Sequence, residues 1–260
     1  VNTGLFGTYI RSIAVSGSRL LAGTAGSGVY RSDDNGVNWT ASNAGITSPS
    51  HIYAFAIKEG YVFAAQGGTI YRSTNNGTSW PASFSIFSSY SSVITMMAKG
   101  NDLYSSTTRA CCDGSTGLFR STNNGDSWGG INTGFISSPT VTSIDENDDV
   151  LYIGVSGSPS NNRGVYASAN NGSGWIPVGE GLLTNVVQAV HVHNSYLFAG
   201  TNAGGIYAIP LIQSLPVPVI SSFSPTSGAP GTSVVITGSN FASGVTHVSF
   251  NGSAEVSASV

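Results

Sequence analysis

The sequence predicts an all-β fold: a five-bladed β-propeller of four-stranded units, followed by a smaller β-rich piece at the C-terminal end. Three observations carry this prediction. The 260 residues include 34 glycines and 10 prolines, a composition that favours short strands and tight turns over helices. A ten-residue segment occurs four times. The chain around it repeats every 41–48 residues, which is typical of a four-stranded propeller blade.

The repeated segment reads "YRSDDNGVNW", "YRSTNNGTSW", "FRSTNNGDSW" and "YASANNGSGW" in chain order, and its tryptophans lie 41, 48 and 47 residues apart. A second marker precedes each copy as "LLAG", "VFAA", "LYSS" and "LYIG", and returns a fifth time as "LFAG". A third marker, of the type "GVY", also occurs five times. The sequence therefore contains five units, of which the fifth lacks the ten-residue segment.

Each unit is expected to form four strands, because short apolar runs alternate with Gly, Asn and Ser. In the first unit the predicted strands are "IRSIAVS", "RLLAGT", "GVYRS" and "NWTAS", over residues 10–16, 19–24, 28–32 and 38–42. The ten-residue segment then spans the turn between the third and fourth strands.

The pattern Ser-x-Asp/Asn-x-Gly-x-x-Trp within this segment resembles the Asp-box of bacterial neuraminidase-type (BNR) repeats. We call the four copies box 1 to box 4. Asp or Asn side chains bind backbone amides within turns, and glycine permits positive φ, so these residues suit a tight turn. Since every unit but the last repeats it, the motif is predicted to be structural and not catalytic. Its residues are Ser32, Asp34, Gly36 and Trp39; Ser73, Asn75, Gly77 and Trp80; Ser121, Asn123, Gly125 and Trp128; and Ser168, Asn170, Gly172 and Trp175.

The fifth unit ends at "GIYAIPL" without a fourth strand. The N-terminal "VNTGLF" resembles "INTGFI" at Ile131, which follows box 3. Residues 1–5 are therefore expected to supply the missing strand and close a five-bladed ring, which would remove the open sheet edges. The alternative is that the units are a fragment of a six- or seven-bladed ring.

The periodicity stops after residue 209. The predicted organisation is a propeller over residues 1–209, a proline-rich linker over 210–218, and a separate piece over 219–260. This last piece resembles the start of an IPT/TIG domain, an immunoglobulin-like sandwich, through Pro225, Gly228, Gly231, Val235, Ile236, Gly238, Phe241, Val248 and Phe250. A complete sandwich of this type needs about 100 residues. The piece is thus expected to expose an apolar face, and self-association through it is one hypothesis.

Composition argues against two classes of partner. Charged residues are 8% of the chain, against about 25% in an average soluble domain, and the net charge is −3. The chain has two lysines, Lys58 and Lys99, and its arginines form no cluster. No nucleic-acid partner is expected, because such binding needs a basic surface. No apolar run of about 18 residues exists, so no membrane insertion is expected.

The resemblance to Asp-box proteins implies two enzyme classes, sialidases and xyloglucan hydrolases. Arg31, Arg72 and Arg120 occupy one repeat position on three units, so we expect them to be exposed or to lie between blades, without converging on a single substrate group. Glycoside hydrolysis also needs two carboxyl groups about 5–9.5 Å apart. The acidic run "DENDD" at residues 145–149 is predicted to be a hairpin turn, with a weak calcium site as the alternative.

Histidine and cysteine residues add no clear metal site. His191 and His193 alternate along a predicted strand and face one side together, without an evident third ligand. Cys111 and Cys112 are adjacent, and they are interpreted as two unpaired thiols, a strained vicinal disulfide being the alternative. No metal site and no cofactor are predicted beyond the calcium hypothesis.

The loops between the second and third strands differ strongly between units, and variable loops on a rigid scaffold often bind ligands. The two long loops, at residues 109–116 and 156–163, carry Arg109, Asp113, Asn161, Asn162 and Arg163. The connections between units add His51, Tyr53 and Tyr90. Hydrogen-bonding and aromatic side chains of this kind suit a sugar.

The predicted function is a non-catalytic binding or adhesion module of a secreted or cell-surface bacterial protein, with a glycan or an extracellular protein as its partner. Two alternatives are a structural subunit of a surface layer or filament and a glycoside hydrolase of an Asp-box type.

Overall fold

The structure is a computed structural model of the chain. It describes residues 3–5, 9–85, 92–107, 117–135, 138–156, 163–178, 182, 186–202, 204–211, 219–227, 229, 232–239, 246–248 and 256–258. These residues form strands and turns, and no helix among them is long and apolar enough to cross a membrane. The chain divides into two compact units, Val1–Pro210 and Leu211–Val260.

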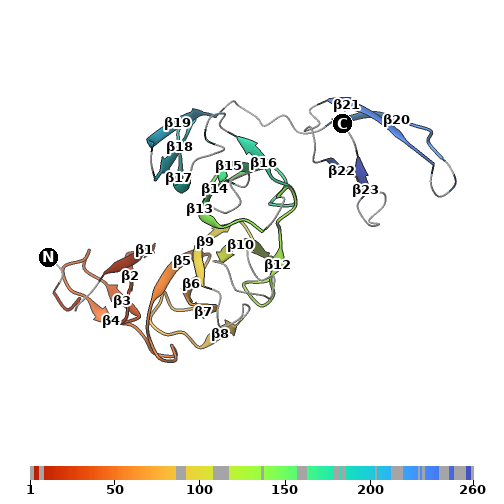
Figure 1. Ribbon diagram of the computed structural model, residues 1–260. Helices are drawn as coiled ribbons and strands as arrows, with labels where there is room; N and C mark the ends of the chain where they lie inside the picture. The colour runs from red at the N-terminus through yellow and green to blue at the C-terminus, as the bar shows by residue number, and fades with distance from the viewer. Residues whose placement is uncertain are drawn as a thin grey trace. The chain divides into compact units, whose positions relative to one another are not determined.

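The described residues of the first unit form five antiparallel sheets, which we call blades 1 to 5 (Figure 1). Neighbours in sequence are neighbours in each sheet, so every blade is a simple meander. The strands are β1 (Ile10–Ser16), β2 (Arg19–Thr24), β3 (Val29–Ser32) and β4 (Thr40–Ala41) in blade 1; β5 (Ile52–Lys58), β6 (Tyr61–Gln66), β7 (Thr69–Ser73) and β8 (Ala82–Ser85) in blade 2; β9 (Val93–Lys99), β10 (Asp102–Thr107), β11 (Gly117–Ser121) and β12 (Gly129–Gly130) in blade 3; β13 (Val141–Asn147), β14 (Val150–Ser156), β15 (Arg163–Ser168) and β16 (Ile176–Val178) in blade 4; and β17 (Val187–His193), β18 (Tyr196–Thr201) and β19 (Gly205–Pro210) in blade 5.

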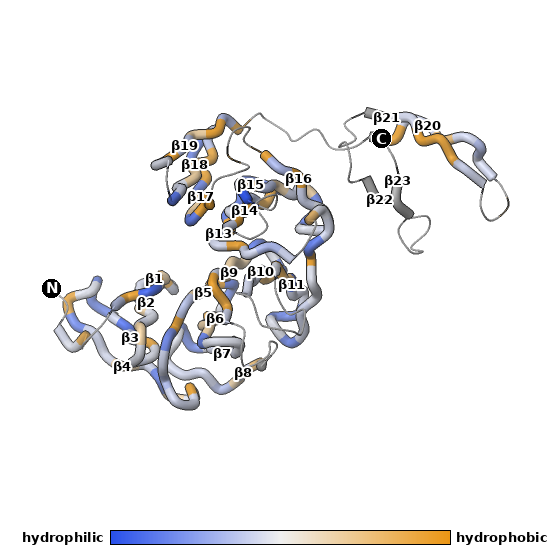
Figure 2. Tube along the Cα trace, in the orientation of Figure 1, coloured by the Kyte–Doolittle hydropathy of each residue, from blue (hydrophilic) through white to orange (hydrophobic). Residues whose placement is uncertain are grey.

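The strands follow the predicted alternation of short apolar runs and turns. β1 and β2 coincide with the first two of the four strands predicted for the first unit, and box 1 lies between β3 and β4 as expected. The predicted all-β fold with repeated four-stranded units is therefore confirmed. In Figure 2 the apolar segments lie mainly along strands, while polar segments occupy many of the turns.

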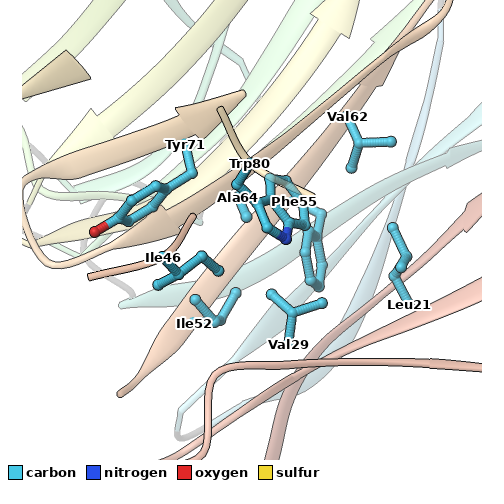
Figure 3. Close-up of a cluster of buried hydrophobic side chains, with 9 residues drawn as sticks. All are labelled: Leu21, Val29, Ile46, Ile52, Phe55, Val62, Ala64, Tyr71 and Trp80. Carbon is cyan, nitrogen blue, oxygen red and sulfur yellow. The ribbon is translucent and has the colours of Figure 1, made fainter. Parts of the chain in front are cut away.

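Successive blades pack through their first strands, β1 against β5, β5 against β9, β9 against β13 and β13 against β17. A hydrophobic cluster fills the space between blades 1 and 2 (Figure 3). Leu21 and Val29 of blade 1 share it with Phe55 and Trp80 of blade 2, all four of which are buried. Comparable clusters join blade 2 to blade 3 and blade 3 to blade 4. The blades thus carry little core of their own and depend on their neighbours.

The N-terminal segment corrects one prediction. Thr3 forms an isolated bridge with Asn38, and its carbonyl accepts the Trp39 N–H at 2.8 Å, both in blade 1. Ala44 accepts the Trp80 N–H and Thr133 accepts the Trp175 N–H in the same way. Residues 3–5 therefore do correspond to the segment after a fourth strand, as the sequence indicated. They do not complete the fifth sheet, whose described strands are β17, β18 and β19.

The second unit contains two hairpins among its described residues. β20 (Val219–Ser224) pairs with β21 (Val235–Ser239), and β22 (Thr246–Val248) pairs with β23 (Val256–Ala258). Ile220, Phe223 and Val235 are exposed, as expected for part of a sandwich that leaves apolar side chains uncovered.

Candidate functional site

The strand order gives each blade two ends. The boxes and the hairpins between first and second strands lie at one end, which we call the box side. The loops between second and third strands and the connections between blades lie at the other end, the loop side. Because the sequence repeats at the box side and varies at the loop side, the two sides are described in turn.

The four boxes share one set of hydrogen bonds. In each box the serine hydroxyl donates to the Asp or Asn Oδ1 and accepts from the glycine N–H, at 2.8–3.0 Å. The same Oδ1 accepts the N–H of the residue four positions later, at 2.8–2.9 Å. Each box glycine has positive φ, as predicted, and so does the asparagine before it. All these groups are used inside the turn, which supports the structural interpretation of the motif.

Box 1 differs from boxes 2 and 3 in which side chain donates the hydrogen bond across the turn. Asp34 accepts the Asn38 side-chain amide at 2.8 Å, whereas Asn75 donates to Ser79 and Asn123 donates to Ser127. The Asn38 backbone N–H, the Asn38 amide and the Ser32 hydroxyl lower the pKa of Asp34, because they stabilise its carboxylate. The residue just before the box tryptophan therefore suits its partner: an asparagine donates to the Asp of box 1, and a serine accepts from the Asn of boxes 2 and 3.

The arginines before the boxes mostly join neighbouring blades. Arg31 of blade 1 donates to Thr78 in box 2 at 3.0 Å, and Arg72 of blade 2 binds Asp126 in box 3 at 2.8 Å. The expectation of contacts between blades is confirmed for these two residues. Arg120 instead binds Asp102 of its own blade at 2.6 Å.

Burial, together with the nearby Asp102 carboxylate, raises the pKa of Tyr104 to about 12.

The loop side of blades 1 and 2 carries a group of aromatic and cationic side chains that we call the platform, formed by Arg11, His51 and Tyr53. The Arg11 guanidinium lies over the Tyr53 ring, with Cζ 5.0 Å from the ring centroid. The His51 and Tyr53 rings are stacked, with centroids 6.0 Å apart and planes inclined by 19°. Arg11 and His51 are exposed and Tyr53 is half-buried, so solvent reaches the group.

Backbone contacts hold the platform in place. His51 forms an antiparallel bridge with Ala25, in the loop between β2 and β3, and the Ala25 N–H donates to Tyr9 at 2.9 Å. The next loop residues are tied down as well, since the Gly28 N–H donates to Ser50 at 2.9 Å. The connection between blades and the variable loop are therefore in contact. Tyr9 is 85% exposed beside them.

His51 and Tyr53 were candidates from the sequence, whereas Tyr9 and Arg11 were not. The signal was present in the alignment of units. Ile10 of β1 corresponds to Ile52 of β5, so Tyr9 corresponds to His51 and Arg11 to Tyr53. Tyr53 was predicted to lie in the connection between units, but it lies within β5.

The other predicted binding residues are not brought together by the described part of the chain. Arg109, Asp113, Asn161, Asn162 and Tyr90 lie outside the described residues, as do Cys111 and Cys112. Arg163 begins β15, where it pairs in register with Ser156 of β14. The predicted role of these residues stays a prediction.

Of the acidic run at residues 145–149, only Asp148 and Asp149 form the predicted hairpin turn, because Asp145 to Asn147 end strand β13. Asp145 accepts the Val192 N–H at 2.7 Å and lies 2.8 Å from His191 Nδ1, so its carboxylate joins blades 4 and 5. His191 and His193 stack with ring centroids 6.5 Å apart. Within the described residues, no group of three or more His, Cys, Asp or Glu side chains could hold a metal ion. The calcium hypothesis gains no support from them.

The described acids of the propeller lie away from the platform. Asp33, Asp34 and Asp126 belong to boxes, while Glu59, Asp102, Asp148 and Asp149 lie at hairpins of the box side, and Asp145 and Glu146 lie near the end of β13. Most of those with described partners bind arginine, histidine or backbone N–H groups. The platform therefore offers aromatic faces and a cation, without a described carboxylate beside it.

Comparisons with known proteins give one family match, in the second unit, and several solved structures that are similar to most of the chain. A protein-family profile described as the IPT/TIG domain matches residues 218–259. No curated protein matches the chain. Three similar solved structures are YCF48 bound to D1 peptide (TM-score 0.59, 11% identity), the GH74 enzyme of Niastella koreensis (0.60, 18%), and the extracellular domain of the putative one component system BT4673 from B. thetaiotaomicron (0.57, 14%).

These matches cover 79%, 78% and 80% of this chain but 64%, 36% and 27% of the respective neighbours, so the chain spans less than two thirds of their length. At such low identity the likeness shows the fold alone. The first unit thus has a β-propeller-like fold, and residues 218–259 match an IPT/TIG domain. An extracellular module fits this combination.

Proposed function

We propose that the chain is a non-catalytic binding module of a secreted or cell-surface protein, and that the platform binds a glycan. The single observation that carries the proposal is the exposed stack of Arg11, Tyr53 and His51. Aromatic faces offer apolar contact to the C–H face of a sugar ring, and the guanidinium offers hydrogen-bond donors to its hydroxyls. The neighbouring Tyr9 enlarges the same surface.

The division of labour between the two ends of the blades supports the proposal. The box side uses its polar groups inside turns and between blades, which leaves few of them for a ligand. The hydrogen bonds of the boxes also support their assignment to the Asp-box type. By contrast, the platform residues differ from their counterparts on blade 3, Ser92 and Ile94, and on blade 4, Thr140 and Thr142. A ligand would therefore contact blades 1 and 2 selectively.

The test is a glycan array probed with the full chain, followed by calorimetric titration of the best glycan. We expect Tyr53→Ala and His51→Ala each to weaken binding by about tenfold, which corresponds to about 1.4 kcal/mol. Tyr196→Ala is the matched control, because Tyr196 is an exposed aromatic residue of β18 in blade 5. The proposal is wrong if the folded protein binds no glycan, or if the Tyr196 variant loses affinity equally.

A glycoside hydrolase is the alternative, since the GH74 enzyme shares the fold. That reaction needs two carboxyl groups flanking the scissile bond. The described acids instead lie in boxes, at box-side hairpins and near the end of β13, many with structural partners. Incubation of the full chain with xyloglucan and an assay for new reducing ends separates the alternatives, because a binding module releases none.

A further inference from the structure

The first strand of blade 1 exposes side chains that are buried at the same positions in other blades. Ile10 corresponds to Ile52 and Ile13 to Phe55, by the register of β1 and β5. Ile52 is fully buried and Phe55 is 9% exposed, because blade 1 packs over them. Ile13 is 67% exposed. We call this surface of β1 the leading face.

Blade 5 shows the complementary difference on its third strand. Ile206 occupies the position of Val29, Ile70 and Leu118, which are fully buried. Ile206 is 77% exposed, and its neighbour Tyr207 is exposed as well. We call this surface of β19 the trailing face, and the orange segments of β18 and β19 in Figure 2 mark the apolar character of blade 5.

The interfaces inside the chain show what each face packs against. Val29 of β3 belongs to the same cluster as Ile52 and Phe55 of β5 (Figure 3). The equivalent clusters combine Ile70 with Val93 and Met96, and Leu118 with Val141 and Ile144. In each case a third-strand residue of one blade meets first-strand residues of the next. The trailing and leading faces are thus the two halves of an interface that the chain makes repeatedly.

The residue before each box and the facing residue of the next box form a polar pair at the edge of two of these interfaces. Two of the three arginines before a box bind a polar residue of the next box, Arg31 with Thr78 and Arg72 with Asp126, whereas Arg120 binds Asp102 of its own blade. The corresponding residue of blade 5 is Ala208, and the corresponding residue of box 1 is Val37, which is exposed. If blade 5 packed against blade 1, an alanine would therefore face a valine at this position, and no arginine there would need a polar partner.

From these observations we infer that a second copy of this chain covers the exposed faces, with the trailing face of one copy on the leading face of the next. The blades of one copy follow one another along an arc, with blades 1 and 5 at its two ends (Figure 1). Ile13 and Ile206 are both exposed in the single chain, so its own blade 5 does not cover the leading face of its blade 1. The contact is heterologous, so it builds a ring or a filament.

The test is disulfide trapping of the full chain, in a background in which Cys111 and Cys112 are replaced by Ser. Chains carrying Ile13→Cys and Ile206→Cys are prepared separately, mixed in equal amounts and oxidised mildly. We expect a disulfide-linked heterodimer in the mixture that exceeds the product of either variant alone. Ile57→Cys replaces Ile13→Cys in the control mixture, because Ile57 is exposed on β5 and belongs to neither face. It should give little heterodimer.

Sedimentation equilibrium provides the second readout. We expect concentration-dependent association of the unmodified chain, and a dissociation constant raised at least about tenfold by Ile13→Asp. Val235→Asp, which changes an exposed residue of the C-terminal unit, should leave it unchanged. Three results would overturn the inference: a monomer at all concentrations, an intramolecular disulfide in a chain carrying both cysteines, or association lost only in the Val235 variant.

Discussion

Boxes 1 and 2 have the same hydrogen-bonded turn and different surroundings. In both, the serine hydroxyl links the Asp or Asn side chain to the glycine N–H. Trp80 of box 2 is buried and donates its indole N–H to Ser42 of blade 1 at 2.8 Å. Trp39 of box 1 is half-buried and donates to Gly36 of its own box at 3.0 Å.

The preceding blade contributes to this difference in box 2, although in box 3, which blade 2 precedes, Trp128 is half-buried and donates to Gly125 of its own box. Leu21 of blade 1 reaches Gly77 of box 2, and the Ser42 hydroxyl donates to the Gly77 carbonyl. The atoms nearest to a Cβ added at Gly36 belong to Leu20 and Trp39 of its own blade. The local sequence therefore sets the turn, whereas a neighbouring blade decides how much of the turn is buried. Matched substitutions in the two boxes separate these contributions.

The largest difference is expected for the tryptophans. Trp80→Ala should lower the free energy of unfolding by about 3–5 kcal/mol, because it empties a packed cluster and leaves the Ser42 carbonyl without its donor. Trp39→Ala should cost about 1–2 kcal/mol, because the ring is only half-buried. Urea unfolding followed by fluorescence of the remaining tryptophans measures both. Equal losses would show that blade 1 does not contribute to box 2.

The glycines should differ by less. Alanine at either position incurs about 1–2 kcal/mol for positive φ. At Gly77 the added Cβ would also lie 2.8 Å from Leu21 Cδ2, which adds about 1–3 kcal/mol of overpacking, whereas at Gly36 the nearest atom is 3.6 Å away. Combining Gly77→Ala with Leu21→Ala should recover part of the loss, so the double-mutant coupling energy measures the contact. Additive losses would contradict this account.

The smallest effect concerns pH. Hydrogen bonds lower the pKa of Asp34 in the folded state, so the carboxylate adds stability above its unfolded pKa of about 3.9. That contribution is lost as the pH falls through the lowered pKa. Asp34→Asn should be less stable than the unchanged protein near pH 7, and the gap should narrow below about pH 4. Unfolding curves at pH 3 to 7 test this.

Asn75→Asp in box 2 is the reciprocal variant. Its new carboxylate would accept the Ser79 N–H, as the Asn75 Oδ1 does now. It should therefore acquire a pH dependence that the unchanged box 2 lacks. A flat profile would mean that the hydrogen bonds of the box do not favour the charged form.

The platform shows why part of the site could not be read from the sequence. His51 and Tyr53 stood out as aromatic residues near a connection, but Arg11 is one cation among several until its guanidinium is seen over Tyr53. The two residues are 42 positions apart, and the packing of β1 against β5 brings them together. Likewise, nothing local to Asp145 indicated that its carboxylate would bind β17 through His191 and Val192.

What the sequence determined by itself is the repeating unit. Strand length, turn position and positive φ at the box glycines follow from side chains within about ten residues of one another, so each copy states them independently. Only the tertiary structure decided which of the repeating units are buried by a neighbouring blade. Residues 3–5 resemble the segment that follows box 3 and, like it, they contact the next box, but the described strands of blade 5 are β17, β18 and β19 alone. The physical reason is that burial of Ile13, Phe55 or Ile206 depends on a neighbouring blade, and identical local sequences cannot specify whether that neighbour is present.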